Sequence, residues 1–355
     1  MNRTVIITLL VLLSISSIAA KTIQNVISVK AGDAESLLKA IEQANEQNAD
    51  SAKAEWLFLM IPDGTYDLGD RVLTTITGHR VALIGQSMTG TIIQNAPAVE
   101  NEGIGKTATL RNMGTDTYLQ DLTLKNALDY YKADEAGRAV CLQDKGTRTI
   151  CKRVRMLSYQ DTYYSDNLTG QMYMDNCEIH GTVDFICGPA DVYFNHCTIV
   201  TEPRGRHEKE GDVIAAPRTR DTSWGYIFES CTIYNRQSDF FLARGWQSTP
   251  HCIWLNTTLM SPEKLKVSRF DSQGMRTVQN DFKEYNTMDA EGHNITPESN
   301  VITFTLDDKK HTAETILTAS EAQKYKLKKI FPKWRPEKVT KKMACKADKL
   351  KQQYF

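Results

Sequence analysis

The stretch YMDNCEI at residues 173–179 returns twenty residues later as YFNHCTI at residues 193–199. Each copy consists of a short strand, a polar pair, a small or apolar residue and a second short strand. Related segments occur at residues 118–124, 150–156, 226–233 and 254–260. The small or apolar position of the pattern falls at Leu122, Val154, Cys177, Cys197, Cys231 and Thr258.

The successive spacings of this position are 32, 23, 20, 34 and 27 residues. A unit of about twenty residues with variable insertions is typical of a solenoid. Short strands with asparagine at the turns indicate a parallel β-helix, in which successive rungs stack about 4.8 Å apart. The sequence therefore predicts an all-β solenoid, with the repeated position directed into the stack.

Composition and the N-terminus bear on the class of protein. The 355 residues carry 43 basic and 43 acidic groups, which excludes a nucleic-acid binder driven by overall positive charge. Residues 1–20 combine Arg3, a short apolar run and a small-residue end, and they predict a signal peptide. We expect an exported protein, periplasmic or extracellular, with no membrane span. Composition permits a monomer, which we expect.

Eight cysteines in an exported chain raise the question of disulfides. Cys177 and Cys197 would lie one rung apart, within bridging distance. The same position also accepts Leu, Val and Thr, so we favour free thiols that act as small apolar residues. No pair or cluster has the spacing of a zinc site, and no metal is expected.

The two ends of the solenoid differ in character. Asp33 precedes apolar residues at helical spacing, which predicts an N-terminal capping helix. Residues 21–320 form the predicted solenoid domain. Residues 321–355 hold twelve basic and three acidic residues and predict a basic tail, irregular or helical, packed on or beside the solenoid through Phe331 and Trp334.

Two aspartates occupy the same place relative to the repeat. Asp161 follows Val154 by seven residues, and Asp184 follows Cys177 by seven. If Val154 and Cys177 stack, the two carboxyl groups lie about one rung apart, and one of them is favoured to stay protonated. Such a pair supplies one nucleophile and one acid, although a pair of turn-capping aspartates fits the spacing too.

Here the sequence resembles the pectinesterase family, the pectin methylesterases. It has GTY at 64–66, RAVCL at 138–142, QDTY at 160–163, GTVDFICG at 181–188 and LARGW at 242–246, and EYNT at 284–287 is similar to a late family element. The resemblance covers residues 60–320 and is most specific in GTVDF and QDT. It implies a right-handed parallel β-helix, in agreement with the repeat.

The resemblance also implies roles for individual residues. Asp184 matches the nucleophile, Asp161 the general acid/base, Gln160 an oxyanion donor, Arg244 the arginine that orients the nucleophile, and Trp246 a sugar-stacking aromatic. Tyr163 and Phe185 sit beside the aspartates and are candidates for the sugar site or for the core. Arg138 replaces a family glutamine, so it is a candidate oxyanion donor or carboxylate contact.

The implied substrate is pectic polysaccharide with methyl-esterified galacturonic acid, and no cofactor is needed. Three alternatives remain: a pectate lyase, a polygalacturonase and a non-catalytic pectin-binding solenoid. A lyase needs a calcium cluster and a basic proton acceptor, and a hydrolase needs carboxylates set for a glycosidic bond. Gln160 beside Asp161, followed by Arg244, favours ester chemistry over the first two. Because Arg138 replaces a family glutamine, the third alternative, a non-catalytic pectin-binding solenoid, stays open.

Overall fold

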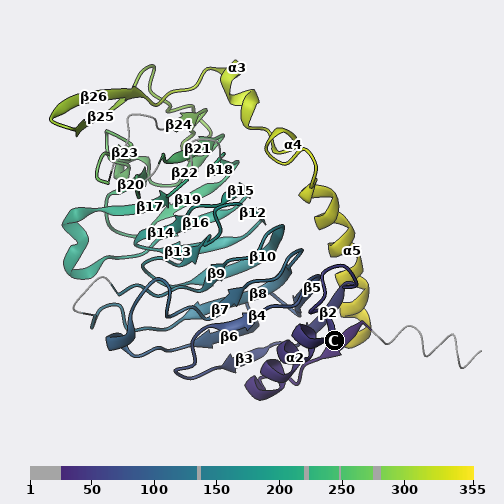
Figure 1. The fold of residues 1–355 in the computed structure, drawn as a ribbon. Coiled ribbons are helices and arrows are strands. Elements are labelled where there is room, and N and C mark those ends of the chain that lie inside the picture. The colour runs from purple at the N-terminus through teal and green to yellow at the C-terminus, as the bar shows by residue number, and fades with distance from the viewer. Residues whose placement is uncertain (1–24, 134–136, 220–223, 248, 275–280) are drawn as a thin grey trace, which may run out of the picture.

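The structure is a computed structural model that describes residues 25–133, 137–219, 224–247, 249–274 and 281–355. It is a right-handed parallel β-helix whose rungs are stacked along one axis (Figure 1). The predicted signal peptide at residues 1–20 lies outside the described residues.

Two parallel sheets account for the rungs. The larger sheet contains β1 (Val26–Ser28), β2 (Leu57–Ile61), β3 (Gly64–Asp67), β5 (Val81–Gly85), β6 (Thr91–Asn95), β8 (Tyr118–Asn126), β10 (Thr149–Leu157), β12 (Gln171–Asp175), β13 (Glu178–Gly181), β15 (Asp191–Asn195), β16 (Thr198–Thr201), β18 (Tyr226–Glu229), β19 (Thr232–Asn235), β21 (His251–Leu255), β22 (Thr258–Leu259) and β24 (Asp281–Tyr285). The smaller sheet contains β4 (Thr74–Ile76), β7 (Leu110–Asn112), β9 (Leu142–Asp144), β11 (Tyr163–Tyr164), β14 (Val183–Gly188), β17 (Asp212–Pro217), β20 (Phe240–Arg244) and β23 (Phe270–Asp271).

In each repeat, one residue in the left-handed conformation turns the chain at a corner of the rung. This residue belongs to the polar pair of the repeat and accounts for it. Such residues, all at positive φ, are Asp121, Arg153, Asn176, His196, Ser230 and Asn256. Each one directly precedes an inward residue, and Asn and Asp tolerate this conformation better than most side chains. Because Thr232 pairs with Thr258, the inward residue of the last rung is Thr257. The prediction of Thr258 was therefore wrong by one position, and the last spacing is 26 residues.

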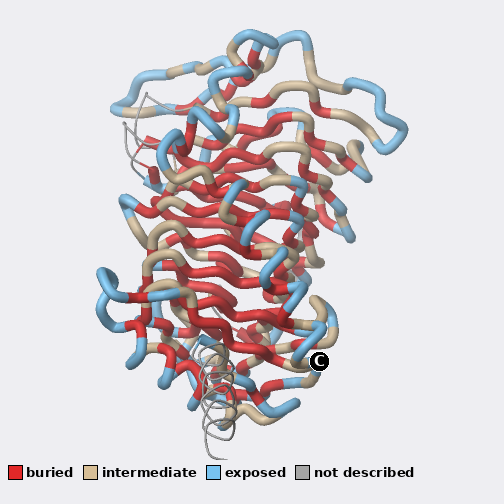
Figure 2. Tube along the Cα trace, turned by 90° about the vertical axis from the view of Figure 1, so that its right-hand side faces the viewer, coloured by how far each residue is buried: buried red, intermediate tan, exposed pale blue. Residues whose placement is uncertain are grey.

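The inward residues form one continuous core along the axis (Figure 2). All eight cysteines are free thiols, seven buried and Cys345 exposed. Cys177 and Cys197 occupy neighbouring rungs as small apolar side chains. Further along, Phe194, Phe228 and Trp254 stack face to face, with ring centroids 4.3 Å and 3.8 Å apart. The repeat thus builds ladders of like side chains.

The N-terminal capping helix is present as α2 (Ala34–Gln47). The side chain of Asp33 accepts a hydrogen bond from the backbone N–H of Ser36 at 2.9 Å, which makes it the predicted N-cap. Leu37, Ile41 and neighbouring apolar residues pack against the first rungs. The helix therefore closes one end of the core (Figure 1).

The C-terminal region is an antiparallel hairpin followed by helices that run back along the stack (Figure 1). The elements are β25 (Val301–Leu306), β26 (Lys309–Glu314), α3 (Ala319–Ala322), α4 (Leu327–Ile330) and α5 (Pro336–Tyr354). Phe331, Met343 and Leu350 are buried in a second apolar cluster, on the outer face of the larger sheet. The tail is thus mostly helical and joined to the solenoid by its own core.

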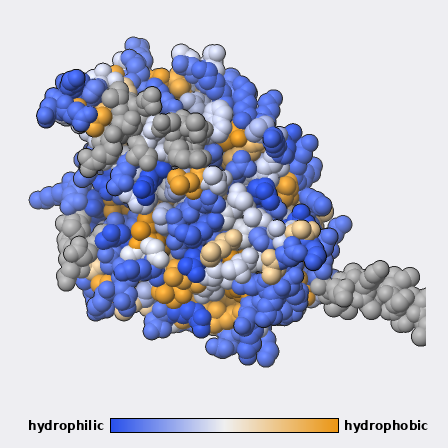
Figure 3. All heavy atoms as spheres, in the orientation of Figure 1, coloured by the Kyte–Doolittle hydropathy of each residue, from blue (hydrophilic) through white to orange (hydrophobic). Residues whose placement is uncertain are grey.

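The outer surface is largely hydrophilic on the face shown in Figure 3, where hydrophobic residues form small separate groups. In the part of the chain that the structure describes, no helix is both long and apolar enough to cross a membrane.

Candidate active site

Asp161 and Asp184 lie opposite one another on adjacent rungs. Tyr163 pairs with Ile186 in the smaller sheet, and the backbone N–H of Thr182 donates to the carbonyl of Tyr159 at 2.7 Å. Each contact joins two residues that are 23 positions apart in the sequence. Asp161 and Asp184 lie between these two contacts and are also 23 positions apart. The structure therefore brings the two predicted aspartates together.

The backbone turns at both aspartates. Asp161 has φ 58° and Asp184 has φ 52°, so both stand in the left-handed region. At Asp184 the pairing of β14 with β17 also shifts by one residue between Val183 and Ile186. Bulges of this kind redirect a side chain away from the regular pleat. The turns let each aspartate directly precede a buried residue, Thr162 or Phe185, without its carboxyl group entering the apolar core.

Arg244 fixes the carboxylate of Asp184. Its Nε donates to Oδ1 at 2.7 Å, and a terminal nitrogen donates to Oδ2. The other terminal nitrogen donates to Oε1 of Gln273 at 2.7 Å. This two-point pairing matches the planar guanidinium to the planar carboxylate. Arg244 is the last residue of β20, so the sheet holds its backbone in place.

The surroundings separate the pKa values of the two carboxyl groups. Burial, and next the negative charge of Asp184, raise the pKa of Asp161 well above its ordinary value. Burial also raises the pKa of Asp184, but the Arg244 guanidinium opposes that effect. The arrangement favours a protonated Asp161 beside an ionised Asp184.

Gln160 and Arg138 lie on adjacent rungs and form a parallel bridge. The side chain of Gln160 is half-buried and makes no hydrogen bond to any described residue, which leaves its amide available as a donor. Arg138 pairs with Glu102, to which its Nε donates at 3.0 Å and a terminal nitrogen at 2.8 Å. The charge of Arg138 also lowers the pKa of Asp161, so it lies near the aspartate pair.

Sequence reasoning missed Glu102. It precedes Arg138 by 36 residues, in a loop that carries no recognisable motif. The only available signal was the arginine itself, because a partly buried cation needs an acidic partner.

Trp246 is half-buried beside two residues that sequence reasoning also missed. Its ring lies 6.0 Å from that of Tyr164, tilted by 52°, and the guanidinium carbon of Arg218 lies 5.7 Å from the ring centre. Strand alternation could have found Tyr164, since its neighbour Tyr163 points inward. These three side chains form an aromatic and cationic surface at the edge of the smaller sheet.

Tyr163 and Phe185 belong to the core, so the prediction that they line a sugar site is wrong. Both side chains are fully buried. The hydroxyl of Tyr163 donates to Sδ of Met172 at 3.0 Å. Phe185 packs over Gly181, where an added Cβ would lie 2.2 Å from the Cβ of Phe185. Neither ring has a surface that a polymer can touch.

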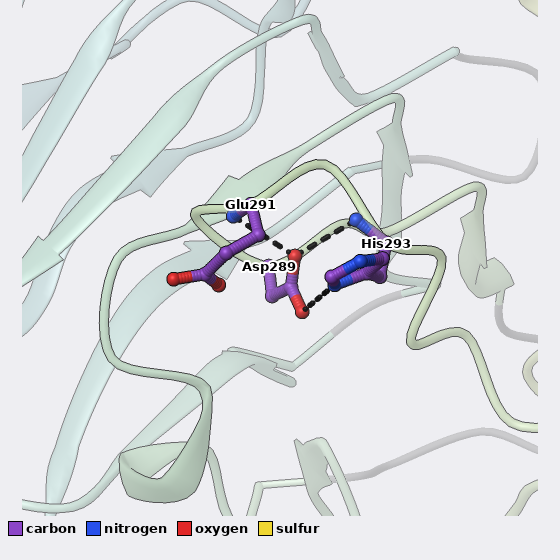
Figure 4. Close-up of side chains that lie close together, drawn as sticks. All are labelled: Asp289, Glu291 and His293. Atoms are coloured by element: carbon purple, nitrogen blue, oxygen red, sulfur yellow. Dashed lines mark hydrogen bonds and ion pairs between the residues drawn. The ribbon is translucent and has the colours of Figure 1, made fainter.

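Asp289, Glu291 and His293 are a group of possible metal ligands among the described residues (Figure 4). Asp289 accepts hydrogen bonds from the backbone N–H groups of Glu291 and His293 and from the ring of His293. Glu291 and His293 are exposed. These contacts are those of an aspartate that closes a surface turn, and we assign no metal to it.

Comparisons with known proteins identify the family of the chain. The sequence model of one family, described as Pectinesterase, matches residues 25–330. The chain is 24% identical over 67% of its length to the probable pectinesterase/pectinesterase inhibitor 64 of Arabidopsis thaliana, covering 41% of that protein. It is 32% identical over 35% of its length to pectinesterase A of Emericella nidulans, covering 38% of it. The chain thus spans about two fifths of the length of these relatives.

Solved structures share the fold. The pectin methylesterase from carrot superposes with a TM-score of 0.69 at 19% identity, over 86% of this chain and 92% of that one. The pectin methylesterase of Erwinia chrysanthemi gives 0.63 at 22%, over 88% and 98%. A pectin methylesterase solved in complex with a hexasaccharide gives 0.62 at 22%, over 84% and 93%.

Proposed function

Because this chain belongs to the pectinesterase family, we propose that it is a carboxylic ester hydrolase that removes methyl esters from galacturonic acid residues of pectin and releases methanol. The observation that carries the proposal is the two-point pairing of Arg244 with Asp184, beside a second buried carboxyl group. A fixed carboxylate next to a protonated one is the combination that ester transfer through an acyl-enzyme needs.

Asp184 is the proposed nucleophile. Its carboxylate attacks the ester carbonyl, and the negative charge moves to the carbonyl oxygen. Each carboxylate oxygen keeps a lone pair beyond the one that accepts from Arg244, so the ion pair orients the group without blocking it. The amide of Gln160 donates to the developing oxyanion, which stabilises the transition state. Arg138 supplies positive charge on the rung before.

Asp161 is the proposed acid and then the base. In its protonated form it gives a proton to the departing methoxide, which leaves as methanol, and an acyl-enzyme remains on Asp184. The carboxylate of Asp161 then takes a proton from the water that attacks this acyl group. Galacturonate leaves, and Asp184 is free as a carboxylate again. The high pKa of Asp161 suits the first step.

The substrate and the setting are part of the proposal. The half-exposed ring of Trp246, with Tyr164 and Arg218 beside it, offers an aromatic plane and a cation to an acidic sugar chain. The predicted signal peptide supports export to the periplasm or beyond. We propose that the enzyme works as a monomer without a cofactor, as a domain of residues 21–320 with its basic tail.

The test is methanol release from methylated oligogalacturonides. The proposal expects one methanol for each ester lost, with no shortening of the chain and no unsaturated sugar. Chain shortening would identify a polygalacturonase, and an unsaturated product a lyase. Tight binding without any methanol would identify a non-catalytic pectin-binding solenoid.

A further inference from the structure

A hollow separate from the aspartate pair lies on the outer face of the larger sheet, over β8, β10 and β13. We call it the side pocket. Its volume is about 620 Å³, within the range of small-ligand sites. The residues that matter for its chemistry are Lys125, Tyr131, Arg155, Glu178, His180 and Glu202.

Strand register builds the floor of the side pocket. Leu157 pairs with Lys125 on one side and with His180 on the other. Two residues earlier, Arg155 pairs with Glu178. The residues between them, such as Met156, point into the core, so alternation turns the polar side chains outward. Three adjacent rungs thus present one polar surface.

Three tyrosines form the wall. The rings of Tyr130 and Tyr159 stack at 4.8 Å with an interplanar angle of 8°. Tyr131 meets both rings edge-on, at 5.3 Å and 5.2 Å, and its hydroxyl donates to the carbonyl of Pro203 at 2.9 Å. Tyr131 is nevertheless 51% exposed. A fixed and exposed aromatic ring is a plane on which a sugar can stack.

Most of the charges in the side pocket neutralise one another. His180 lies between two acids, with Nε2 2.7 Å from Glu178 and Nδ1 2.6 Å from Glu202. Those acids raise the pKa of His180 against the effect of burial, which is the largest influence on it. Arg236 approaches Glu202 to 3.3 Å. Glu178 and Glu202 are therefore paired with His180 and Arg236.

Two further cations, Arg155 and Lys125, make no hydrogen bond or close ion pair to a carboxylate among the described residues, although the charge of Arg155, after His180, helps to lower the pKa of its strand neighbour Glu178. Arg155 donates from Nε to the hydroxyl of Thr123 at 3.1 Å, and Lys125 makes no side-chain ion pair. Asp129 at the rim is paired with Lys132 at 2.8 Å. The side pocket thus combines an aromatic plane with two cations that a ligand carboxylate can pair with.

We infer that the side pocket binds an acidic sugar of the pectic substrate, a galacturonate unit with a free carboxylate. The sugar ring stacks on Tyr131, and its carboxylate pairs with Arg155 and Lys125. This inference rests on the proposed function for the origin of the ligand. Tyr159 of the wall directly precedes Gln160 in the sequence, so the side pocket adjoins the aspartate pair. A pectic chain or branch that extends from one to the other places its ester at Asp184 and a free carboxylate in the side pocket.

The experiment measures binding of unmethylated trigalacturonate by titration calorimetry at low salt. Wild-type protein should bind it at least about tenfold more tightly than neutral trigalactose. The double substitution Lys125→Gln/Arg155→Gln should weaken binding at least about tenfold, because it removes both cations. The control Lys341→Gln/Lys342→Gln removes the same charge from exposed positions on α5 and should change binding less than twofold.

Two further variants locate the ligand. Tyr131→Ala should weaken binding about tenfold, whereas Tyr131→Phe keeps the ring and should stay within twofold. The same losses should appear when these substitutions are made in a Trp246→Ala background, because Trp246 does not line the side pocket. Melting temperatures equal to wild type establish that the variants are folded.

The inference is overturned if trigalacturonate does not bind, if trigalactose binds equally well, or if the double substitution leaves binding unchanged. A loss that occurs in Trp246→Ala and not in the side-pocket variants also overturns it, since the sugar then lies on the aromatic surface of Trp246 and Tyr164. Trigalacturonate binding in the side pocket without methanol release from any ester would refute the proposed function and leave this inference standing.

Discussion

Arg244 and Asp184, sixty residues apart in the sequence, are joined by two parallel hydrogen bonds from one guanidinium to one carboxylate. The pairing places a guanidinium in direct contact with Asp184 and not with Asp161. Burial alone would raise both carboxyl pKa values alike. The arginine breaks that equivalence, so it assigns the two chemical roles that the proposed mechanism needs.

Substitution of either aspartate should separate those roles. Asp184→Asn should lower kcat roughly a thousandfold or more on every ester, because an amide is a poor nucleophile. Asp161→Asn should also be severe on methyl esters, but milder on activated aryl esters whose leaving group needs little protonation. Asp308→Asn makes the same change at another positive-φ residue and should have no effect. Equal losses of Asp161→Asn on both esters would count against Asp161 as the acid.

Substitution of Arg244 should move the acid limb of the pH profile. Arg244→Gln removes the charge that opposes the rise in the pKa of Asp184, so the acid limb of kcat/KM should shift to higher pH. Arg244→Lys keeps the charge but loses the two-point pairing, and it should lower kcat roughly tenfold to a hundredfold with a smaller shift. An acid limb that stays in place in Arg244→Gln would mean that Arg244 does not control the ionisation of Asp184.

Arg138 is testable through the split between kcat and KM. If it stabilises the oxyanion, Arg138→Ala should lower kcat roughly a hundredfold with a smaller change in KM, and Arg138→Gln should restore activity. If it binds a substrate carboxylate, KM should rise instead, more for substrates with free acids nearby, and Arg138→Gln should not restore it. Values within about twofold of wild type would refute both roles.

The pairing of Arg138 with Glu102 gives a second measurement on the same residue. The positive charge of Arg138 lowers the pKa of Asp161, so Arg138→Ala should shift the alkaline limb of activity to higher pH. The carboxylate of Glu102 acts in the opposite direction on the same pKa, so Glu102→Gln should shift that limb to lower pH. Shifts in the same direction would contradict this electrostatic account.

Asp144 should make stability depend on pH. Burial raises its pKa from 3.8 to about 6, and its Oδ2 has no hydrogen-bond partner among the described residues. A carboxyl group with a raised folded-state pKa stabilises the fold below its unfolded pKa, and that contribution is lost as pH rises through 6. Between pH 4 and pH 8, the unfolding free energy of Asp144→Asn should therefore gain about 2 kcal/mol relative to wild type. An unchanged difference in chemical denaturation would refute this.

The C-terminal helix should be required for stability. Leu350 of α5 is buried against the outer face of the larger sheet, and Leu350→Ala should lower the free energy of unfolding by about 2–5 kcal/mol. The neighbouring exposed Lys349→Ala should leave it within about 0.5 kcal/mol. Equal melting temperatures for the two variants would show that α5 contributes little.

The sequence alone determined the fold and the aspartate pair because both depend on local repetition. Each rung repeats a polar corner and an inward residue, so Val154 and Cys177 fall into register and carry Asp161 and Asp184 with them. The error at Thr258 arose where the repeat contains two adjacent threonines, and only pairing with the previous rung identifies which of them points inward.

Only the tertiary structure decided which side chains face the site and which partners they meet. Alternation of inward and outward residues holds within a strand, but the left-handed turns at Asp161 and Asp184 interrupt it, so Tyr163 and Phe185 enter the core. Arg138 meets Glu102 across a loop on the neighbouring rung, and Arg244 reaches Asp184 across the one rung that holds β17. Such contacts depend on how many residues each loop inserts between rungs. A sequence motif identifies the residues of a site but does not show which loops bring them together.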